Sequence, residues 1–209
     1  MQVKFSGQNH GFLWQNVKLG QSFTFGRKND KIVITLLRKE LRFMKEISVE
    51  ELKINPSTLI GKEWALLTAG NKDSYNTMTV SWGQMGELWN KPTTVVYIRP
   101  QRYTKEFVDK NDYYTLSFLP DGHREALSYL GSHSGREEDK LAKTELTGTA
   151  TDDYAYIEQA KLVLVCKKLY RQPMTPDSFI DKSLIEKCYA AGDFHEMYVG
   201  EIVKVLVSE

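Results

Sequence analysis

The sequence predicts a mainly β fold, a β-barrel with inserted helices, and three features of the chain support this prediction. Short runs rich in β-branched and aromatic residues alternate with turn clusters of Gly, Pro, Asn and Asp, which is typical of antiparallel strands. Helical patterns are short, and no strand–helix–strand repeat predicts a parallel sheet. Aromatic residues are abundant, with 11 Tyr, 9 Phe and 4 Trp among 209 residues, which suits a β-rich core.

The predicted elements lie in the part of the chain that follows Met44. Each strand is an apolar or β-branched run that stops at a turn signal, as the run before Arg99-Pro100 does. The predicted strands cover residues 64–69, 77–82, 93–98, 113–119, 161–170 and 197–207. The predicted helices cover residues 104–110, 123–131, 137–144 and 176–189, and Thr104 suits the cap of the first.

Residues 1–43 differ in composition from the rest, because much of this segment is polar and shows no sustained period. We predict that Met44 is the natural start, that residues 1–43 are an extension which is not native or is poorly ordered, and that residues 44–209 form one domain. A real hairpin or arm in this segment is the alternative. Mass spectrometry of the native protein distinguishes the two.

Composition excludes several partners. The net charge of +1 gives no field directed at nucleic acid or an anionic membrane, so any anion must be bound by a local basic cluster. No apolar run approaches the ~18 residues of a membrane span, and lysines and arginines interrupt the N-terminal apolar stretches. Cys166 and Cys188 lie far apart, which favours buried thiols in a reducing compartment and a cytoplasmic protein.

Common enzyme motifs are missing. The sequence has no GxGxxG, no P-loop and no GxSxG elbow, so the usual dinucleotide, nucleotide and hydrolase interpretations fail. His195 follows Asp193-Phe194 without a second ligand at metal-site spacing. We therefore expect no metal and interpret His195 as a structural histidine or one that lies near a ligand.

Three polar segments are candidates for a binding site. In residues 75–83 the hydroxyls of Thr77, Thr79 and Ser81 alternate along a strand, so they share one face and could bond the polar edge of a flat heterocycle. A solvent-facing threonine ladder is an equally good interpretation of this segment. The other two segments combine hydroxyls with cations.

Residues 99–105 join a strand end to a helix start, where Arg102, Lys105 and free helix N–H groups favour an anion. In residues 131–140, Gly135 lets the backbone approach a ligand closely. Ser134 precedes this glycine, and Arg136 and Lys140 follow it. Alone, the first of these segments is better interpreted as a solvated basic turn with Thr104 as a helix cap, and the second, which could equally be a loop and a helix start, is weak evidence for a site. Together, the three predict a site for an anionic aromatic ligand.

The sequence closely resembles the flavin reductase family, which includes flavoredoxin and NAD(P)H:FMN oxidoreductases. The resemblance begins near Glu46, runs to the C-terminus and does not cover residues 1–43. Its motifs occur in the family's order and spacing, and their combination is specific although each piece is not. They are ALLTAG (65–70), YNTMTVSWG (75–83), LWNKP (88–92), YIRPQRYT (97–104), GSHSGR (131–136), DK (139–140) and HEMYVGEI (195–202).

The resemblance implies an FMN-binding split β-barrel that forms a homodimer, with the flavin near the subunit interface and with flavin and nicotinamide as its small-molecule partners. It implies hydride transfer from NAD(P)H to the flavin, which leaves the final acceptor, a small molecule or another protein, undetermined. The cofactor-binding residues that it implies are Asn76, Thr77, Met78, Thr79, Ser81, Trp82, Arg99, Arg102, Tyr103, Thr104, Ser134, Gly135, Arg136 and Lys140.

Two questions stay open at this stage. The sequence does not decide which of Arg102, Arg136 and Lys140 contacts the phosphate. It also leaves two alternatives to the reductase: a flavin-binding electron-transfer or carrier protein without efficient NAD(P)H turnover, and a flavin-free interaction protein that keeps only the fold.

Overall fold

The computed structural model describes residues 22–27, 30–35 and 44–208, and the chain divides into two compact units, 1–41 and 42–209. In the first unit, β1 (Ser22–Arg27) and β2 (Asp30–Thr35) pair as an antiparallel hairpin. This is the hairpin that the sequence left open as an alternative. The rest of the predicted extension lies outside the described residues, and its absence from the native chain stays a prediction.

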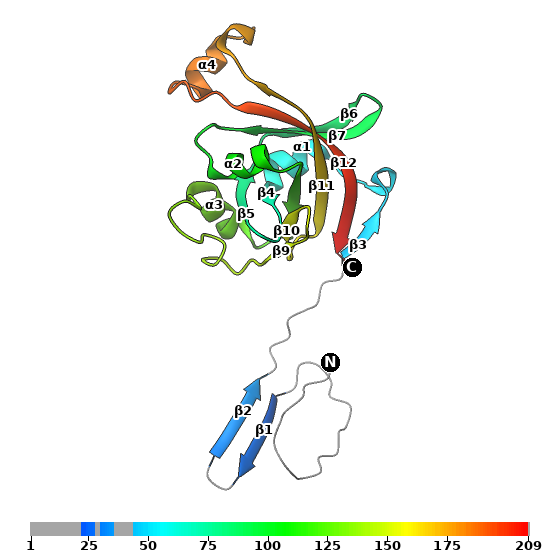
Figure 1. Ribbon diagram of the computed structural model, residues 1–209, viewed down its shortest axis with the longest axis vertical. Helices are drawn as coiled ribbons and strands as arrows, with labels where there is room; N and C mark the ends of the chain where they lie inside the picture. Colours follow the sequence, from blue (N-terminus) through cyan, green and yellow to red (C-terminus); the bar gives the residue numbers. More distant parts are fainter. Residues whose placement is uncertain (1–21, 28–29, 36–43, 209) are drawn as a thin grey trace. The chain divides into compact units, whose positions relative to one another are not determined.

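One antiparallel sheet forms most of the second unit (Figure 1). The strand order is β5-β4-β8-β11-β12-β7-β6, and β3 pairs with β12 beside this path. Consequently β5 and β6 end the path, each with one edge unpaired within it. The strands are β3 (Met44–Ile47), β4 (Ala65–Gly70), β5 (Tyr75–Val80), β6 (Gly83–Leu88), β7 (Lys91–Ile98), β8 (Tyr113–Phe118), β11 (Leu162–Pro173) and β12 (Glu196–Ser208), and a separate small sheet pairs β9 (Gly148–Ala150) with β10 (Ala155–Ile157).

Short helices fill the connections between strands. Two of them, α2 and α3, pack against β5, the edge strand that carries the first candidate segment. The ends of β11 and β12 continue as a two-stranded arm that leads to α4 (orange in Figure 1). The helices are the 3-10 turn η1 (Val49–Glu51), α1 (Pro56–Thr58), the π-helical η2 (Leu59–Glu63), α2 (Tyr103–Lys110), α3 (Arg124–Ser132), the 3-10 turn η3 (Pro176–Ser178) and α4 (Ser183–Cys188).

Two hydrophobic clusters cover the two faces of the sheet. Every residue of β4 is buried, because alternate side chains enter different clusters: Leu67 packs with Met78 and Leu116, whereas Leu66 packs with Leu127 of α3. A strand that is buried on both faces has a continuous apolar sequence, and the apolar run at residues 64–69 predicted β4 for this reason. The sheet therefore holds β5 and the helices α2 and α3 in fixed relative positions.

The structure confirms the mainly β fold and each of the predicted strands, and it differs in the connections. Strand β6 was not predicted; it turns back into β7 through Trp89 and Asn90, which both adopt positive φ (57° and 56°). Left-handed conformations at both central residues are typical of a two-residue hairpin turn, and only Asn90 signals one. The predicted helix 176–189 is split into η3 and α4.

The predicted helix 137–144 does not form. Residues 137–144 make successive turns instead, with backbone bonds from Glu137 to Ser134 and from Lys143 to Lys140. Lys140 is only 4% exposed, because its side chain reaches under the end of α3 and its Nζ donates to backbone carbonyls there. This tertiary contact overrides the local helix propensity of the segment.

Both cysteines of the described residues are free thiols. Cys166 is fully buried, and burial raises the pKa of its thiol to about 12, so it is an inert core residue. Cys188 is partly exposed, so the prediction that both thiols are buried holds for Cys166 alone. Within the described ranges, no helix has the length and apolar character that crossing a membrane would require.

Candidate functional site

The three polar segments come together at one end of β5. The Asn76 side chain of β5 donates a hydrogen bond from Nδ2 to Oγ1 of Thr104 in α2, at 2.7 Å. The loop after α3 lies against both, since a Cβ added to Gly135 would stand 2.2 Å from Asn76 Oδ1 and 3.2 Å from the Tyr103 ring. Only glycine allows this approach of the loop backbone. The expected convergence of the strand, the helix start and the glycine loop is thus confirmed.

Two of the pockets at this junction form the candidate site. The first, here called the cationic pocket, has a volume of about 200 Å³; it is lined by Asn76, Met78, Gln101, Arg102, Tyr103, Thr104, Ser132, His133, Ser134, Gly135 and Lys140. The second, here called the central pocket, has a volume of about 380 Å³; it is lined by Met78, Thr79, Val80, Ser81, Trp82, Tyr97, Arg99, Gln101, Arg102 and His195. The two share Met78, Gln101 and Arg102, so they adjoin. Among the described residues, no carboxylate lines either pocket.

Arg102 and Lys140 are the cations that the cationic pocket holds. Arg102 donates to the carbonyl of Gly131 at 2.6 Å, and Lys140 Nζ donates to the carbonyls of Leu130 and His133 at 2.7 and 3.0 Å. These carbonyls belong to the C-terminal end of α3, where the helix dipole favours positive charge. The described residues provide neither side chain with an ion-pair partner.

Burial removes water from the Arg102 and Lys140 side chains, and few nearby groups replace the lost hydration of their charges. Desolvation, and then the charge of Arg102, lower the pKa of Lys140 to about 8, and the charge of Glu138 opposes them only in part. Desolvation, followed by the charge of Arg99, also lowers the pKa of Arg102. Two neighbouring cations that are removed from water and bonded only to carbonyls gain stability when a dianion enters between them.

The start of α2 adds a second attraction for an anion. Arg102 is the N-cap residue and its side chain makes no capping bond, so the first N–H groups of this eight-residue helix lack a side-chain acceptor. Tyr103 and Thr104, the first residues of the helix, line the cationic pocket. Helix N-terminal amides next to cations form the usual site for a phosphate.

The other two arginines of the candidate set have partners. Arg99 pairs with Asp193 and also donates to the carbonyl of Cys188 at 2.9 Å. Arg136 pairs with Glu106 at 2.5 Å, and its guanidinium also stacks over the Tyr103 ring. Arg136 does not line the cationic pocket, whereas Arg102 and Lys140 do. Arg102 and Lys140 are therefore placed to bind a phosphate, whereas Arg136, which the sequence does not distinguish from them, is not.

The hydroxyls of β5 serve the protein interior rather than an open face. Thr77 is 2% exposed; its hydroxyl donates to the carbonyl of Leu67 and accepts from Thr68. The hydroxyl of Thr79 donates to the carbonyl of Leu127 at 2.5 Å, which ties β5 to α3. Thr77 lines neither pocket, so the expected row of ligand-facing hydroxyls is not what this strand presents. Asn76, Met78 and the stretch from Thr79 to Trp82 supply its pocket surface instead.

An aromatic pair lines part of the central pocket. Trp82 follows β5, is 49% exposed and lies 5.3 Å from the His195 ring, measured between centroids. His195 Nδ1 is 2.9 Å from the hydroxyl of Tyr189. Burial, and then the charge of Arg99, lower the pKa of His195 to about 4, so the imidazole is neutral at neutral pH.

Four lining residues of the central pocket were not among the sequence candidates: Val80, Tyr97, Gln101 and His195. Gln101 lies inside the predicted basic segment, between Arg99 and Arg102. Tyr97 stands two residues before Arg99 at the end of the same strand, and this spacing could have placed both on one face. The position of His195 could not be derived, because it depends on how the arm returns to the sheet.

The arrangement of strands, with an antiparallel sheet that leaves β5 and β6 as edges and helices inserted between strands, is that of a split β-barrel. The family described as "Flavin reductase like domain" matches residues 59–209, and the chain belongs to this family. A search of curated protein sequences finds no match.

Solved structures of similar fold include three flavoproteins. The FMN-binding protein from Thermus thermophilus, whose structure contains 1-cyclohex-2-enone, is 26% identical, with a TM-score of 0.51 over 68% of this chain and 68% of that chain. Flavoredoxin from Methanosarcina acetivorans is 22% identical, with a TM-score of 0.52 over 74% of this chain and 73% of that chain. Flavoredoxin of Desulfovibrio vulgaris (Miyazaki F) is 22% identical, with a TM-score of 0.54 over 70% of this chain and 69% of that chain.

Proposed function

We propose that the chain binds FMN, with the phosphate in the cationic pocket and the ring in the central pocket, and that it transfers hydride from NAD(P)H to the flavin. The observation that carries this proposal is the junction of the two pockets at Met78, Gln101 and Arg102. One side of the junction offers unpaired cations and helix amides, and the other offers an aromatic wall. A phosphorylated aromatic ligand needs this combination.

The residues of the site fit the parts of FMN. Arg102, Lys140 and the N–H groups of Tyr103 and Thr104 would hold the phosphate. Met78 and Trp82 would contact the ring. Because β5 is an edge strand, part of its backbone is left unpaired by the sheet, and its N–H groups would stabilise negative charge that develops on the ring. FMN supplies the two-electron chemistry, so the protein needs no nucleophile of its own.

The test of this proposal is the spectrum of the purified full chain with FMN under anaerobic conditions. We expect saturable FMN binding, followed by bleaching of the flavin bands when NADH or NADPH is added. The two nicotinamides are compared by stopped-flow reduction, since no feature of the chain selects one. A yellow protein that neither nicotinamide bleaches would contradict the reductase and assign the carrier role. A protein that ignores added FMN would contradict both.

We also propose that two copies of the chain associate through the β6–β7 hairpin. Trp89 at its tip is 56% exposed, and its ring lies 6.1 Å from that of Tyr170, which is also exposed, as are Leu88 and Leu169. An edge strand that displays large apolar side chains is a ready surface for self-association.

The association predicts a change of mass in a double variant. Trp89→Ser combined with Tyr170→Ser removes the paired rings, so this variant should sediment as a monomer at concentrations where the native chain sediments as a dimer. Analytical ultracentrifugation makes the comparison, and circular dichroism checks that the variant is folded. A native chain that is monomeric, or a variant that remains dimeric, would contradict this interface.

A further inference from the structure

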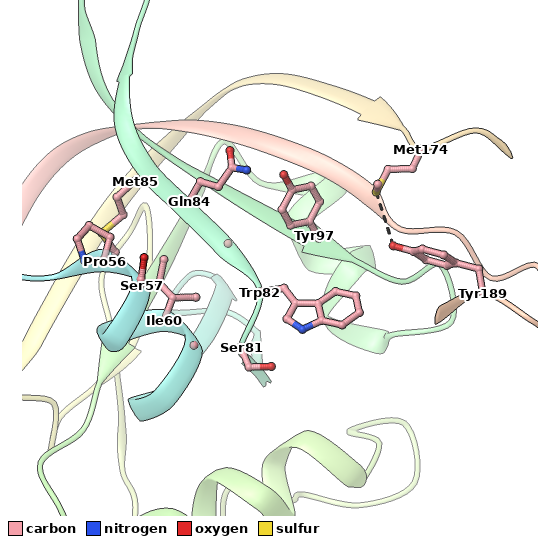
Figure 2. Close-up of a pocket in the computed structure, with 12 residues that line it drawn as sticks. Pro56, Ser57, Ile60, Ser81, Trp82, Gln84, Met85, Tyr97, Met174 and Tyr189 are labelled. Atoms are coloured by element: carbon pink, nitrogen blue, oxygen red, sulfur yellow. Dashed lines mark hydrogen bonds between the residues drawn. The ribbon is translucent and has the colours of Figure 1, made fainter. Parts of the chain in front are cut away.

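We infer that a third pocket, next to the central pocket, binds small uncharged planar carbonyl compounds, which would be the substrate class that meets the flavin. That these compounds would meet a flavin rests on the proposed function, but their binding to the pocket does not require FMN. The third pocket, here called the neutral pocket, has a volume of about 530 Å³ (Figure 2). It is lined by Pro56, Ser57, Ile60, Gly61, Ser81, Trp82, Gly83, Gln84, Met85, Tyr97, Met174 and Tyr189.

In the part of the chain that the structure describes, no charged side chain lines the neutral pocket. The central pocket, by contrast, contains Arg99 and Arg102, and the cationic pocket contains Arg102 and Lys140. A charged ligand would lose water in the neutral pocket without gaining a partner of opposite charge in its lining, whereas an uncharged ligand avoids this loss of hydration energy. The lining therefore selects against anions such as a carboxylate or a second phosphate.

The neutral and central pockets share a wall. Ser81, Trp82 and Tyr97 line both, so a molecule in the neutral pocket lies next to whatever fills the central pocket. Trp82 and Tyr97 lie between the two ends of the lining, with Met174 and Tyr189 at one end and Pro56 and Met85 at the other (Figure 2). Aromatic rings and methionine thioethers favour contact with a flat unsaturated ligand.

The polar groups of the neutral pocket suit a carbonyl oxygen. The Tyr97 hydroxyl, the Gln84 amide and the hydroxyls of Ser57 and Ser81 line this pocket and form no side-chain hydrogen bond to other described residues. Burial raises the pKa of Tyr97, which keeps its hydroxyl protonated as a donor. Each of these groups can donate to an acceptor, and a ketone or aldehyde brings an acceptor without a competing charge.

Two glycines give a matched pair of variants for the test. A Cβ added to Gly61 or to Gly86 meets no atom within 4 Å, so either position accepts a side chain without a clash. Gly61 lines the neutral pocket, whereas Gly86, on β6, lines none of the three pockets. Gly61→Phe should fill the neutral pocket, and Gly86→Phe is its control for added apolar surface.

The probes are acetophenone, which is neutral and planar, and 4-acetylbenzoate, which adds one carboxylate to the same shape. Calorimetric titration of the full chain, with and without FMN, should show acetophenone binding at least about tenfold tighter than 4-acetylbenzoate, because the carboxylate would be desolvated without a partner. Gly61→Phe should weaken acetophenone binding by at least about tenfold, since the ligand's volume is occupied, and Gly86→Phe should leave it unchanged. FMN affinity should be the same in both variants.

Equal affinity for the two probes, or acetophenone binding that Gly61→Phe leaves intact, would overturn the inference. So would a protein that binds FMN and not acetophenone, and in that case the proposed function would stand. If FMN failed to bind while acetophenone bound in a Gly61-dependent way, the proposed function would fall and the neutral pocket would stand.

Discussion

Arg102→Met is expected to lower FMN affinity by about a hundredfold, since it removes charge-assisted hydrogen bonds worth about 1.5–3 kcal/mol each. Arg102 lines both the cationic and the central pocket, and no carboxylate competes for its charge within the described residues. Riboflavin, which has no phosphate, should bind Arg102→Met and the native chain with affinities within about threefold of each other. Quenching of flavin fluorescence on titration measures all four affinities.

The matched control for this prediction is Arg136→Met. Arg136 carries the same charge in the neighbouring loop, but it is paired with Glu106 and lies outside the cationic pocket. Its loss should change FMN affinity by less than about threefold, because partly exposed ion pairs contribute little. If Arg136→Met weakened FMN binding as much as Arg102→Met, or if riboflavin lost as much affinity as FMN, the phosphate would not occupy the assigned pocket.

Lys140 gives the second large effect, a dependence of FMN affinity on pH. In the free protein the pKa of Lys140 is lowered to about 8, so the ammonium loses its proton as pH rises through that value. The FMN phosphate becomes a dianion above about pH 6, its second pKa. Affinity should therefore be highest between about pH 6 and 8 and should fall above 8, by up to tenfold per pH unit, because binding then requires uptake of a proton. Lys140→Met should bind FMN more weakly at pH 7 and should lack the fall above pH 8.

The same shift affects the stability of the free protein. The pKa of Lys140 is about 8 when folded and 10.5 as a free side chain, so between these values the unfolded chain binds more protons than the folded one. The free energy of unfolding should therefore rise with pH in this window relative to that of Lys140→Met. Denaturant unfolding of both proteins at pH 7 and pH 9.5 gives the comparison. A difference between the two proteins that does not change with pH would show that Lys140 is not desolvated in the free protein.

Most of the large sheet could be predicted from the sequence because each of the six predicted strands carries its own signal. The β-branched run before Arg99 and the apolar run of β4 are determined by burial on a sheet, which requires no knowledge of distant residues. The turn at Trp89 could not be predicted, since tryptophan does not signal a left-handed backbone. The failed helix at 137–144 has a similar cause, because a long-range contact of Lys140 with α3 decides its conformation.

The site could be predicted only as a set of segments. Which cations are available depends on partners that lie elsewhere in the chain: Glu106 pairs with Arg136 across 30 residues, and Asp193 pairs with Arg99 across 94 residues. Likewise, Thr77 appears in the sequence as a ligand-facing hydroxyl, but its buried bonds to Leu67 and Thr68 are set by strand pairing. Local sequence patterns do not show which distant residue will pair with a given cation or hydroxyl.

A crystal structure of the full chain with FMN tests the central claim most directly. The phosphate is predicted to accept hydrogen bonds from Arg102 and Lys140 at the start of α2, with the ring in the central pocket between Met78 and Trp82. A phosphate bound at Arg136, or a ring that lies outside the central pocket, would contradict the account.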